Sequence, residues 1–445
     1  MKLGALFLPL STILIFHMGC SEQLPSKRVS REHRIYDFAN RIKYKNSMEA
    51  HLATLYKRAD IDMVVVTVKN LAGESIDTVT ARLFTEWKIG ENTNGLKGVL
   101  FFLSEKEQLV RFEVGYDLEW IYTDAFTGYI ERDQMAPFFK LGRVEDGISA
   151  TLEMIIARAN EKIEEQKYDP AEKKTTKGDT YYSGGAGATQ RIEIGSIKIP
   201  EKTNYPADIK ALFVPQPTPA EAYLLDIEKC KRHIRGYDFD LYTNETREIS
   251  KNWVFTKAQM DNEVRDTAGK SFRIFIKENR AIAVFEPKFR NCPPCYLKKC
   301  RRGWQLDIAT MSKTIHFDMR NRAHIGLYQN PYKDLFKENG YTFGVNGFLY
   351  YKGEEPAYLG ISSWDGGTRA AKILTLVKDG PGEKAGLQVN DTIIKVGDID
   401  VKGTHEIVMA ENRYKIGETV LVKVKRGIRT KKIKVTLEAY DPYRE

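Results

Sequence analysis

Apolar residues in the first third of the chain follow two different spacings. Helical spacing marks the segments 48–55 and 76–87, and uninterrupted apolar runs occur at 63–66 and 98–103. Runs of this kind are typical of strands whose two faces are both covered. Because helical and strand patterns alternate, we expect residues 35–166 to fold as an α/β sandwich around a mixed sheet.

The pattern changes twice further along the chain. Residues 167–216 are rich in Lys, Thr, Gly and Pro, which predicts a flexible linker. A capping box at Thr218-Pro-Ala-Glu221 opens a helix, and two later strand patterns read as a hairpin. We therefore expect residues 217–340 to form a middle α+β unit, for which a cone-shaped fold similar to nuclear transport factor is one option.

Turn and strand signals are densest near the C-terminus. Gly380-Pro-Gly382 marks a turn, and Gly386 suits the left-handed residue that ends a short helix. Asn390-Asp391 then opens a strand of branched residues at 392–396. The layout predicts a small β-barrel or β-sandwich over residues 345–440. The whole chain is expected to be a multidomain α/β and α+β protein.

A short loop upstream of that helix is the candidate binding site. Residues Tyr358, Leu359, Gly360 and Ile361 lie where outward-pointing backbone N–H groups would precede an exposed edge strand. Such a loop can hold a carboxylate, and such an edge can accept an extra strand from a partner. The sequence therefore predicts binding of protein C-termini or extended peptides.

These motifs carry a family resemblance. Pro381, Ala385-Gly-Leu387 and Asp391 make residues 356–438 resemble a PDZ domain of the bacterial, protease-associated type. The chain departs from that pattern at three positions, which are Gly382, Asn390 and Asp398. Three further residues are expected to line the peptide groove, namely Ile407, Val408 and Glu411.

Length and charge exclude some classes of protein. A chain of 445 residues is too long for one ordinary core, and 42% apolar residues argue against wholesale disorder. The net charge of +9 is modest for this length, so no nucleic-acid partner is expected. The basic clusters at 298–302 and 423–434 are read as solvated faces, with anionic lipid headgroups as the functional alternative.

The N-terminus points to export. An apolar stretch at 3–16 is too short to span a bilayer and is typical of a signal peptide. Gly19-Cys20 after it resembles a bacterial lipoprotein cleavage site, which implies a signal at residues 1–20 and a lipid on Cys20. Ordinary secretion and an uncleaved anchor are the alternatives. The prediction is a protein of the bacterial cell envelope, anchored at the periplasmic or outer face of a membrane.

Four cysteines remain in the mature chain: Cys230, Cys292, Cys295 and Cys300. In an exported protein they suggest disulfides, for which three connectivities exist. A zinc site with four thiolate ligands is the alternative, because Cys292-Pro-Pro-Cys295 has ligand spacing. A second C-x-x-C pair is missing, so disulfides are favoured.

Carboxylates gather after the strand pattern at 109–114. Asp117, Glu119 and Asp124 follow the turn, and Asn94 precedes the neighbouring strand. Such hard oxygen ligands suit calcium or magnesium, and Asp124 and Glu119 are the candidate catalytic residues. A cap on the next helix is the favoured interpretation of Asp124, with the metal or catalytic role as its alternative.

This first region resembles the TPM domain family. The matching elements are Gly73-Glu-Ser-Ile76, Leu83-Phe84 with Trp87, Gly98-Val-Leu100, and Val114 to Glu119. The resemblance implies calcium binding at acidic residues and an acid phosphatase activity. However, Leu96-Lys97 replaces a polar pair that usually precedes Gly98, and Asp117 and Trp120 replace small residues. No complete catalytic set is present.

Two functions follow from the sequence. One is a membrane-anchored exported adaptor, whose PDZ-like domain binds partner termini or extended segments and whose TPM-like domain associates with envelope or membrane proteins. The alternative is a metal-assisted phosphatase that uses Asp124, Glu119 and neighbouring oxygens.

Overall fold

The computed structural model describes residues 28–165, 167–171, 189–196, 205–318, 321–364 and 371–443. The predicted signal peptide and Cys20 lie outside these ranges, as does much of the predicted linker. The chain divides into two compact units. The first comprises Met1–Asp124 with Pro170–Arg191, and the second comprises Ala125–Asp169 with Ile192–Glu445. The fold is multidomain α/β, as predicted.

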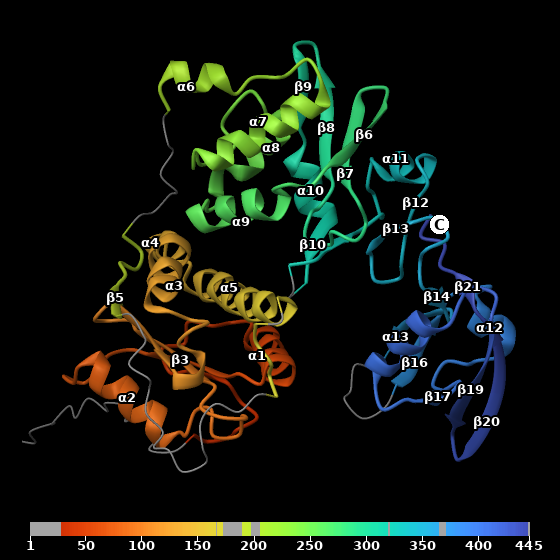
Figure 1. The fold of residues 1–445 in the computed structure, drawn as a ribbon, viewed down its shortest axis with the longest axis horizontal. Helices are drawn as coiled ribbons and strands as arrows, with labels where there is room; N and C mark the ends of the chain where they lie inside the picture. The colour runs from red at the N-terminus through yellow and green to blue at the C-terminus, as the bar shows by residue number, and fades with distance from the viewer. Residues whose placement is uncertain are drawn as a thin grey trace, which may run out of the picture. The chain divides into compact units, whose positions relative to one another are not determined.

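The first unit contains a five-stranded mixed sheet in the order β1-β2-β3-β4-β5 (Figure 1). β1 to β3 are parallel, whereas β4 and β5 run antiparallel to their neighbours. The strand bounds are Ile35–Asp37, Asp62–Val68, Gly98–Ser104, Leu109–Val114 and Thr189–Arg191. Every residue of β2 and β3 is buried, which confirms the prediction of central strands covered on both faces.

Helices α1 (Lys45–Ala59) and α2 (Ile76–Glu86) complete the first unit. Ser75 caps α2, because its side chain accepts a hydrogen bond from Thr78 N–H. The apolar face of α2 packs against alternate residues of the central strands, including Val66 and Phe102. A 3-10 turn at Tyr116–Leu118 follows β4 and leads to the acidic segment.

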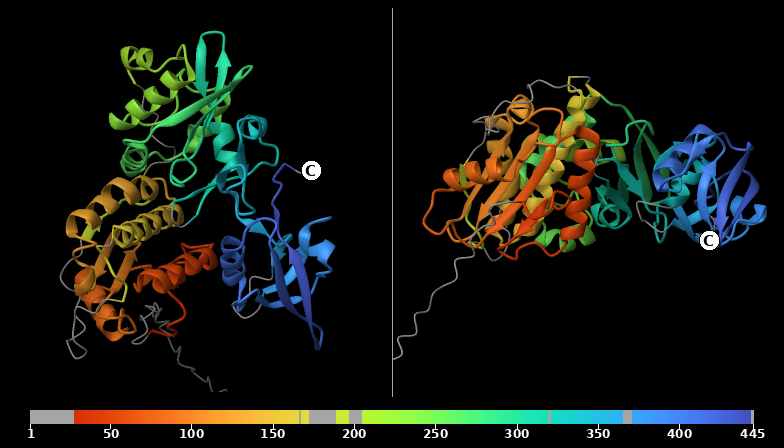
Figure 2. Two further views of the ribbon diagram at one scale, coloured as in Figure 1. Left: turned by 45° about the vertical axis from the view of Figure 1, so that its right-hand side comes forward. Right: turned by 90° about the horizontal axis from the view of Figure 1, so that it is seen from below.

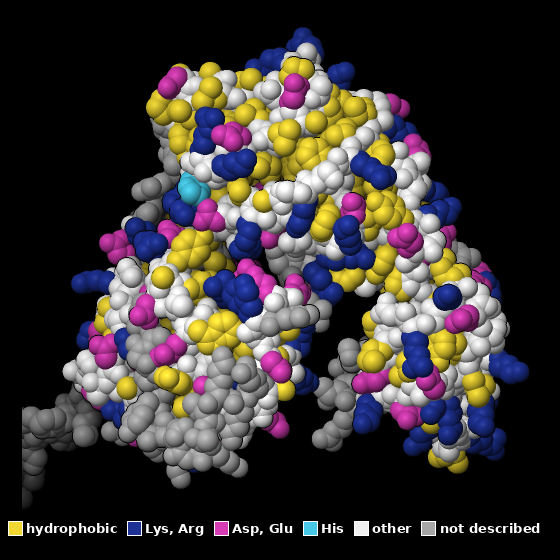
Figure 3. Space-filling view, viewed as in Figure 1, with side chains coloured by type: hydrophobic (Ala, Val, Ile, Leu, Met, Phe, Trp, Pro, Cys, Tyr) yellow, Lys and Arg dark blue, Asp and Glu magenta, His cyan; other side chains and the backbone are white. Residues whose placement is uncertain are grey.

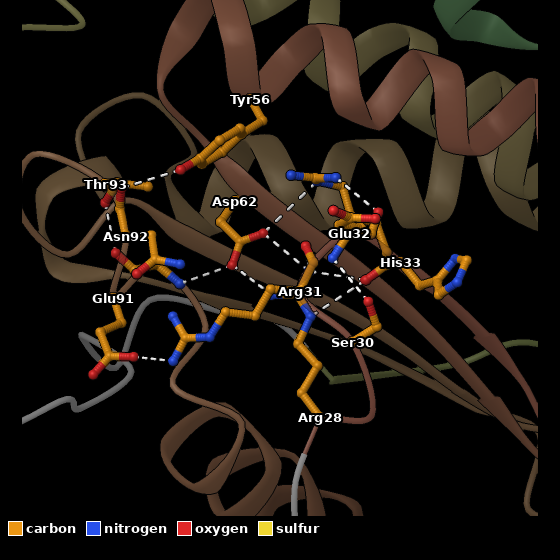
Figure 4. A network of polar contacts seen from close by, with 12 residues as sticks. Arg28, Ser30, Arg31, Glu32, His33, Tyr56, Asp62, Glu91, Asn92 and Thr93 are labelled. Carbon is orange, nitrogen blue, oxygen red and sulfur yellow. Dashed lines mark hydrogen bonds and ion pairs between the residues drawn. The ribbon is translucent and has the colours of Figure 1, made fainter.

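A polar network fixes the start of β2 in the first unit (Figure 4). The Asp62 carboxylate accepts hydrogen bonds from Arg28 Nη1 at 2.7 Å and from Gly90 N–H at 3.2 Å. Arg31 pairs with Glu91 in the loop before β3. The segment from residue 28 is thereby tied to the same end of the sheet as the loop that holds Asn94.

The second unit begins with helices that belong to the TPM-like region. The expected helix at 124–139 is observed as α3 (Asp124–Tyr129), a π-helical turn (Ile130–Met135) and α4 (Ala136–Lys140). The expected helix at 148–163 is observed as α5 (Val144–Glu164). Gly147 on α5 is required by close packing, since a Cβ there would lie 2.7 Å from the Phe139 ring.

The middle region holds an antiparallel sheet in the order β6-β7-β8-β9, whose strands lie side by side in Figures 1 and 2. The strand bounds are Phe272–Lys277, Arg280–Phe285, Cys295–Cys300 and Gly303–Leu306. The helices are α6 (Ala207–Leu212), α7 (Pro219–Lys231), α8 (Asn244–Ile249), α9 (Lys257–Thr267), α10 (Ile308–Thr314) and α11 (Lys333–Glu338). The capping box at Thr218 is present, so the predicted start of α7 is confirmed. The cone-shaped fold stays a prediction.

Two small hairpins follow that sheet. They are β10–β11 (Ile315–Phe317 and Ala323–Ile325) and β12–β13 (Tyr341–Phe343 and Leu349–Tyr351). Their apolar residues pack with Tyr296 of β8 and Tyr332 in one core.

The C-terminal region has a sheet in the order β15-β16-β17-β19-β20, with β18 paired to β17. The strand bounds are Ile361–Trp364, Ala371–Leu376, Thr392–Val396, Thr419–Arg426, Arg429–Thr436 and, for β18, Ile399–Asp400. A separate pair joins β14 (Ala357–Tyr358) to β21 (Glu438–Ala439). Helices α12 (Pro381–Ala385) and α13 (Thr404–Arg413) close the region. Gly386 ends α12 with φ 95°, as predicted.

Within the described ranges, no helix has both the length and the apolar content that crossing a bilayer requires.

Candidate functional site

The candidate site is the turn between β14 and β15. Gly360 forms this turn with φ +81°. A Cβ on Gly360 would lie 2.8 Å from Gly382 N and 2.9 Å from Pro381 Cδ, at the start of α12. Glycine is therefore required here both by the left-handed backbone and by the close approach of a helix.

β15 lies at the end of the strand order and pairs with β16 along one side. No other described strand pairs with it, so its second side is an unpaired edge. The β15–β16 register shifts on either side of Ser363, and such irregularities are frequent at sheet edges and near binding sites. An unpaired edge of this kind can receive an extended segment from another chain.

The apolar residues predicted to contact the peptide divide into two groups. Leu359, Ile361 and Ile407 are buried in the hydrophobic core of this region. Val408 is 46% exposed and Met409, beside it on α13, is 50% exposed. The first three therefore stabilise the fold, and the side chains of Val408 and Met409 are open to a ligand. Met409 was not predicted as a groove residue, although it directly follows Val408.

Two side chains form hydrogen bonds with backbone groups at this turn. Leu359 N–H donates a hydrogen bond to Glu411 Oε1 at 3.0 Å. Tyr358 Oη donates to the Ile361 carbonyl at 2.8 Å. The expectation that the loop N–H groups all point outward is therefore wrong for Leu359, because helix α13 places a carboxylate against it.

Burial governs the titration of both side chains. Burial raises the pKa of Glu411 to about 7, and the Leu359 N–H bond lowers it by a smaller amount. The pKa of the Tyr358 hydroxyl is also raised, first by burial and then by the neighbouring Glu411 carboxylate. Glu411 is thus a carboxyl group held inside the fold at the point where a ligand's carboxylate was expected.

The acidic residues of the TPM-like region have separate surroundings. Asp117 is buried, and its Oδ2 accepts from Leu96 N–H at 3.1 Å. Glu119 is half-buried after the 3-10 turn, and Asp124 is exposed at the start of α3. Gly115 must be glycine because a Cβ would lie 2.1 Å from the Leu96 carbonyl oxygen. The turn therefore packs closely against the loop before β3.

Asn94 and Lys97 share a partner. Asn94 N–H donates to Asp60 Oδ2 at 2.7 Å, and Lys97 Nζ lies 3.6 Å from the same oxygen. The Lys97 ammonium is 2% exposed and also donates to the Pro170 carbonyl at 2.7 Å. A cation of the chain itself thus lies in the loop where the sequence predicts a bound metal, and it would repel a second cation nearby.

No group of three or more His, Cys, Asp or Glu side chains is arranged to hold a metal ion among the described residues. Calcium or magnesium at Asn94, Asp117, Glu119 and Asp124 stays a prediction, as do the catalytic roles of Asp124 and Glu119.

The predicted disulfides are not present. Cys230, Cys292, Cys295 and Cys300 are all free thiols. The Cys292 thiol donates to the Asp266 carbonyl at 3.0 Å. Cys295 and Cys300 are five positions apart on β8 and therefore point to opposite faces of the sheet. Cys230 lies on α7, where burial raises the pKa of its thiol above the usual range. The spacing of cysteines along the chain does not show which face of a sheet or helix each thiol lies on, so it could not predict whether they pair.

Comparison with known families agrees with both sets of motifs. Residues 35–158 match the family model of the TPM domain, and residues 357–437 match that of the PDZ domain. The comparison with curated proteins found no match.

Three solved structures are similar to parts of the chain. The solution structure of the N-terminal domain of a protein from P. gingivalis is 24% identical over 31% of this chain and 87% of that chain, with a TM-score of 0.28. The HtrA3 PDZ domain bound to the phage-derived ligand FGRWV is 19% identical over 16% of this chain and 66% of that chain, with a TM-score of 0.15. The HtrA-type protease AlgW with a decapeptide is 16% identical over 20% of this chain and 30% of that chain, with a TM-score of 0.18.

The two family matches lie at the positions that the sequence motifs mark. The chain therefore carries a TPM domain at residues 35–158 and a PDZ domain at residues 357–437.

Proposed function

We propose that this protein is a membrane-anchored, exported adaptor of the bacterial cell envelope. Its PDZ domain binds an extended segment or a terminus of a partner protein by strand addition, and its TPM domain associates with envelope or membrane proteins. The observation that carries the proposal is the unpaired edge of β15 beside the Gly360 turn.

The edge offers the two contributions that strand addition needs. Backbone N–H and C=O groups along β15, apart from the Ile361 carbonyl that Tyr358 already bonds, supply hydrogen bonds that do not depend on the ligand's sequence. The exposed side chains of Val408 and Met409 on α13 supply apolar surface for a ligand side chain to cover. Backbone pairing then contributes affinity, and the apolar contact contributes preference among partners.

The β19–β20 hairpin supports the membrane part of the proposal. Lys and Arg side chains gather over this hairpin (Figure 3). Ile428 lies in its turn and is 96% exposed. Basic residues around an exposed apolar side chain suit the surface of an anionic bilayer, which would add to a lipid on Cys20.

Titration of the full mature chain with a library of labelled peptides tests the binding function. We expect micromolar binding for a subset of extended, apolar peptides. The Val408→Asp variant should weaken that binding by about tenfold, because it places a charge on the apolar surface of α13. Glu418→Gln serves as the control, since Glu418 is exposed and its carboxylate bonds only Lys415 N–H among the described contacts. Absence of binding across the library would overturn the proposal.

Mass spectrometry of the mature protein tests the anchoring. We expect a chain that begins at Cys20 and carries the added mass of a lipid, and the Cys20→Ser variant should appear in the soluble fraction. A mature chain without lipid would contradict membrane anchoring while leaving the PDZ function intact.

A further inference from the structure

The chain's own side chains fill the ligand-facing groups at one end of β15. Glu411 Oε1 accepts a hydrogen bond from Leu359 N–H at 3.0 Å, and the Tyr358 hydroxyl donates one to the Ile361 carbonyl at 2.8 Å. The first contact joins positions that are distant in sequence, since Glu411 lies 52 positions after Leu359. The second is local, since Tyr358 and Ile361 are three positions apart. Two of the backbone groups at the end of the site that would receive a ligand's terminus are therefore already hydrogen-bonded within the chain.

Among the residues that the structure describes, no basic side chain pairs with the Glu411 carboxyl. It is 7% exposed, and none of the described Lys, Arg or His side chains forms an ion pair with it. Three other basic side chains of this region pair elsewhere: Arg413 with Asp398, Arg426 with Asp391, and Lys384 with Glu438. Once ionised, Glu411 thus presents an unneutralised negative charge to the loop.

A ligand's carboxylate would have to bind next to that charge. The N–H of Gly360, the residue after Leu359, donates to no acceptor among the described residues. A carboxylate held by the Gly360 amide would lie one residue from the amide that Glu411 occupies, in a buried and weakly screened environment. Two carboxylates at such a distance repel each other strongly.

We infer that Glu411 excludes free C-terminal carboxylates from this loop, so that the PDZ domain takes internal extended segments whose chain continues past the loop. An internal segment brings backbone amides and no terminal charge, and it can still pair along the open edge of β15. The inference rests on the proposed peptide-binding function and narrows its class of ligand.

Matched peptides test the inference directly. Each peptide that binds in the library titration is prepared with a free C-terminal carboxylate, with a C-terminal amide, and with added residues beyond the terminus. Affinities for the full mature chain are measured at about pH 8.5, where Glu411 is ionised, since its pKa is raised to about 7. The wild-type protein should bind the amidated and extended forms more tightly than the free acid.

The Glu411→Gln variant removes the charge and retains an oxygen that can accept the Leu359 N–H bond. It should strengthen binding of the free acid on the order of a hundredfold, because juxtaposed like charges cost several kcal/mol, and change binding of the amide little. Glu418→Gln carries the same change of charge at an exposed position. It should change the affinity for neither the free acid nor the amide.

The outcomes separate the two claims. A wild-type preference for the free acid, or equal effects of Glu411→Gln on acid and amide, would overturn the inference and leave peptide binding in place. A failure of every peptide form to bind would overturn the proposed function together with the inference. Should Glu411→Gln not fold, the free acid, amide and extended forms on wild-type protein still decide the matter.

Discussion

Gly360 carries two constraints that no other residue type satisfies together. Its backbone has φ +81°, and a Cβ would meet the backbone of α12 at 2.8 Å. The turn before β15 can therefore form only because residue 360 is a glycine. The shape of the candidate site depends on this residue more directly than on the apolar residues around it.

Gly360→Ala should lower the free energy of unfolding by about 2–4 kcal/mol, since backbone strain adds to a steric clash. Gly417→Ala is the matched control, because Gly417 has φ +88° with open space around it. We expect Gly417→Ala to lower the free energy of unfolding by about 1–2 kcal/mol, through backbone strain alone. Urea unfolding measures both variants, and equal losses would show that the contact with α12 is unimportant.

Glu411 predicts a pH dependence of stability. Its pKa is raised by burial to about 7, above the ordinary value of 4.5 that it takes in an unfolded chain. The folded state therefore binds more protons than the unfolded state between these values, and stability falls as pH rises from about 4.5 to about 7. Glu411→Gln should flatten this part of the profile, with each pKa unit worth about 1.4 kcal/mol.

Urea unfolding at a series of pH values, wild type against Glu411→Gln, measures this difference. If the unfolding free energy of Glu411→Gln falls with pH between about 4.5 and 7 as steeply as that of the wild type, Glu411 is not the group responsible. All other carboxyl groups are the same in both proteins, so their titration cancels in the comparison.

Several elements could be predicted because their signals are local. The apolar runs predicted β2 and β3, the capping box at Thr218 predicted the start of α7, and Gly386 predicted the left-handed end of α12. In each case the residues that determine the element are within a few positions of one another. The family motifs, which also combine nearby residues, were confirmed for the same reason.

Other features depend on contacts that no local pattern encodes. β5 consists of the polar residues Thr189–Arg191 and forms only because it returns to pair with β4. The bond between Glu411 and Leu359 joins residues from separate elements, and the burial of Lys97 depends on the distant Pro170 carbonyl. The sequence named Glu411 as a groove residue, but its contact with the loop amide needed the fold.

The state of the cysteines, predicted as disulfides and observed as thiols, can be measured. All four cysteines of the described chain are thiols, although export suggested disulfides. Titration of the denatured, unreduced Cys20→Ser protein with a thiol reagent should therefore find four thiols per chain. Two fewer would show that one disulfide forms, and treatment with a reductant beforehand supplies the reference value.

At the scale of the whole molecule, one chain combines a TPM domain with a PDZ domain. The TPM domain has an internal cation, Lys97, close to its expected ligand residues, while the PDZ domain has an open strand edge. The basic hairpin and the expected lipid would place both domains near a bilayer. An adaptor needs this combination: one part that holds it at a surface and another that captures a partner.

The most direct test is amide hydrogen exchange of the full chain with and without a bound peptide. The account predicts that protection increases at residues 361–364 of β15, because the added strand pairs with its open edge. The same change should be absent in a variant that cannot bind the peptide. Protection that appears at β20 or in the TPM domain, with β15 unchanged, would contradict the account.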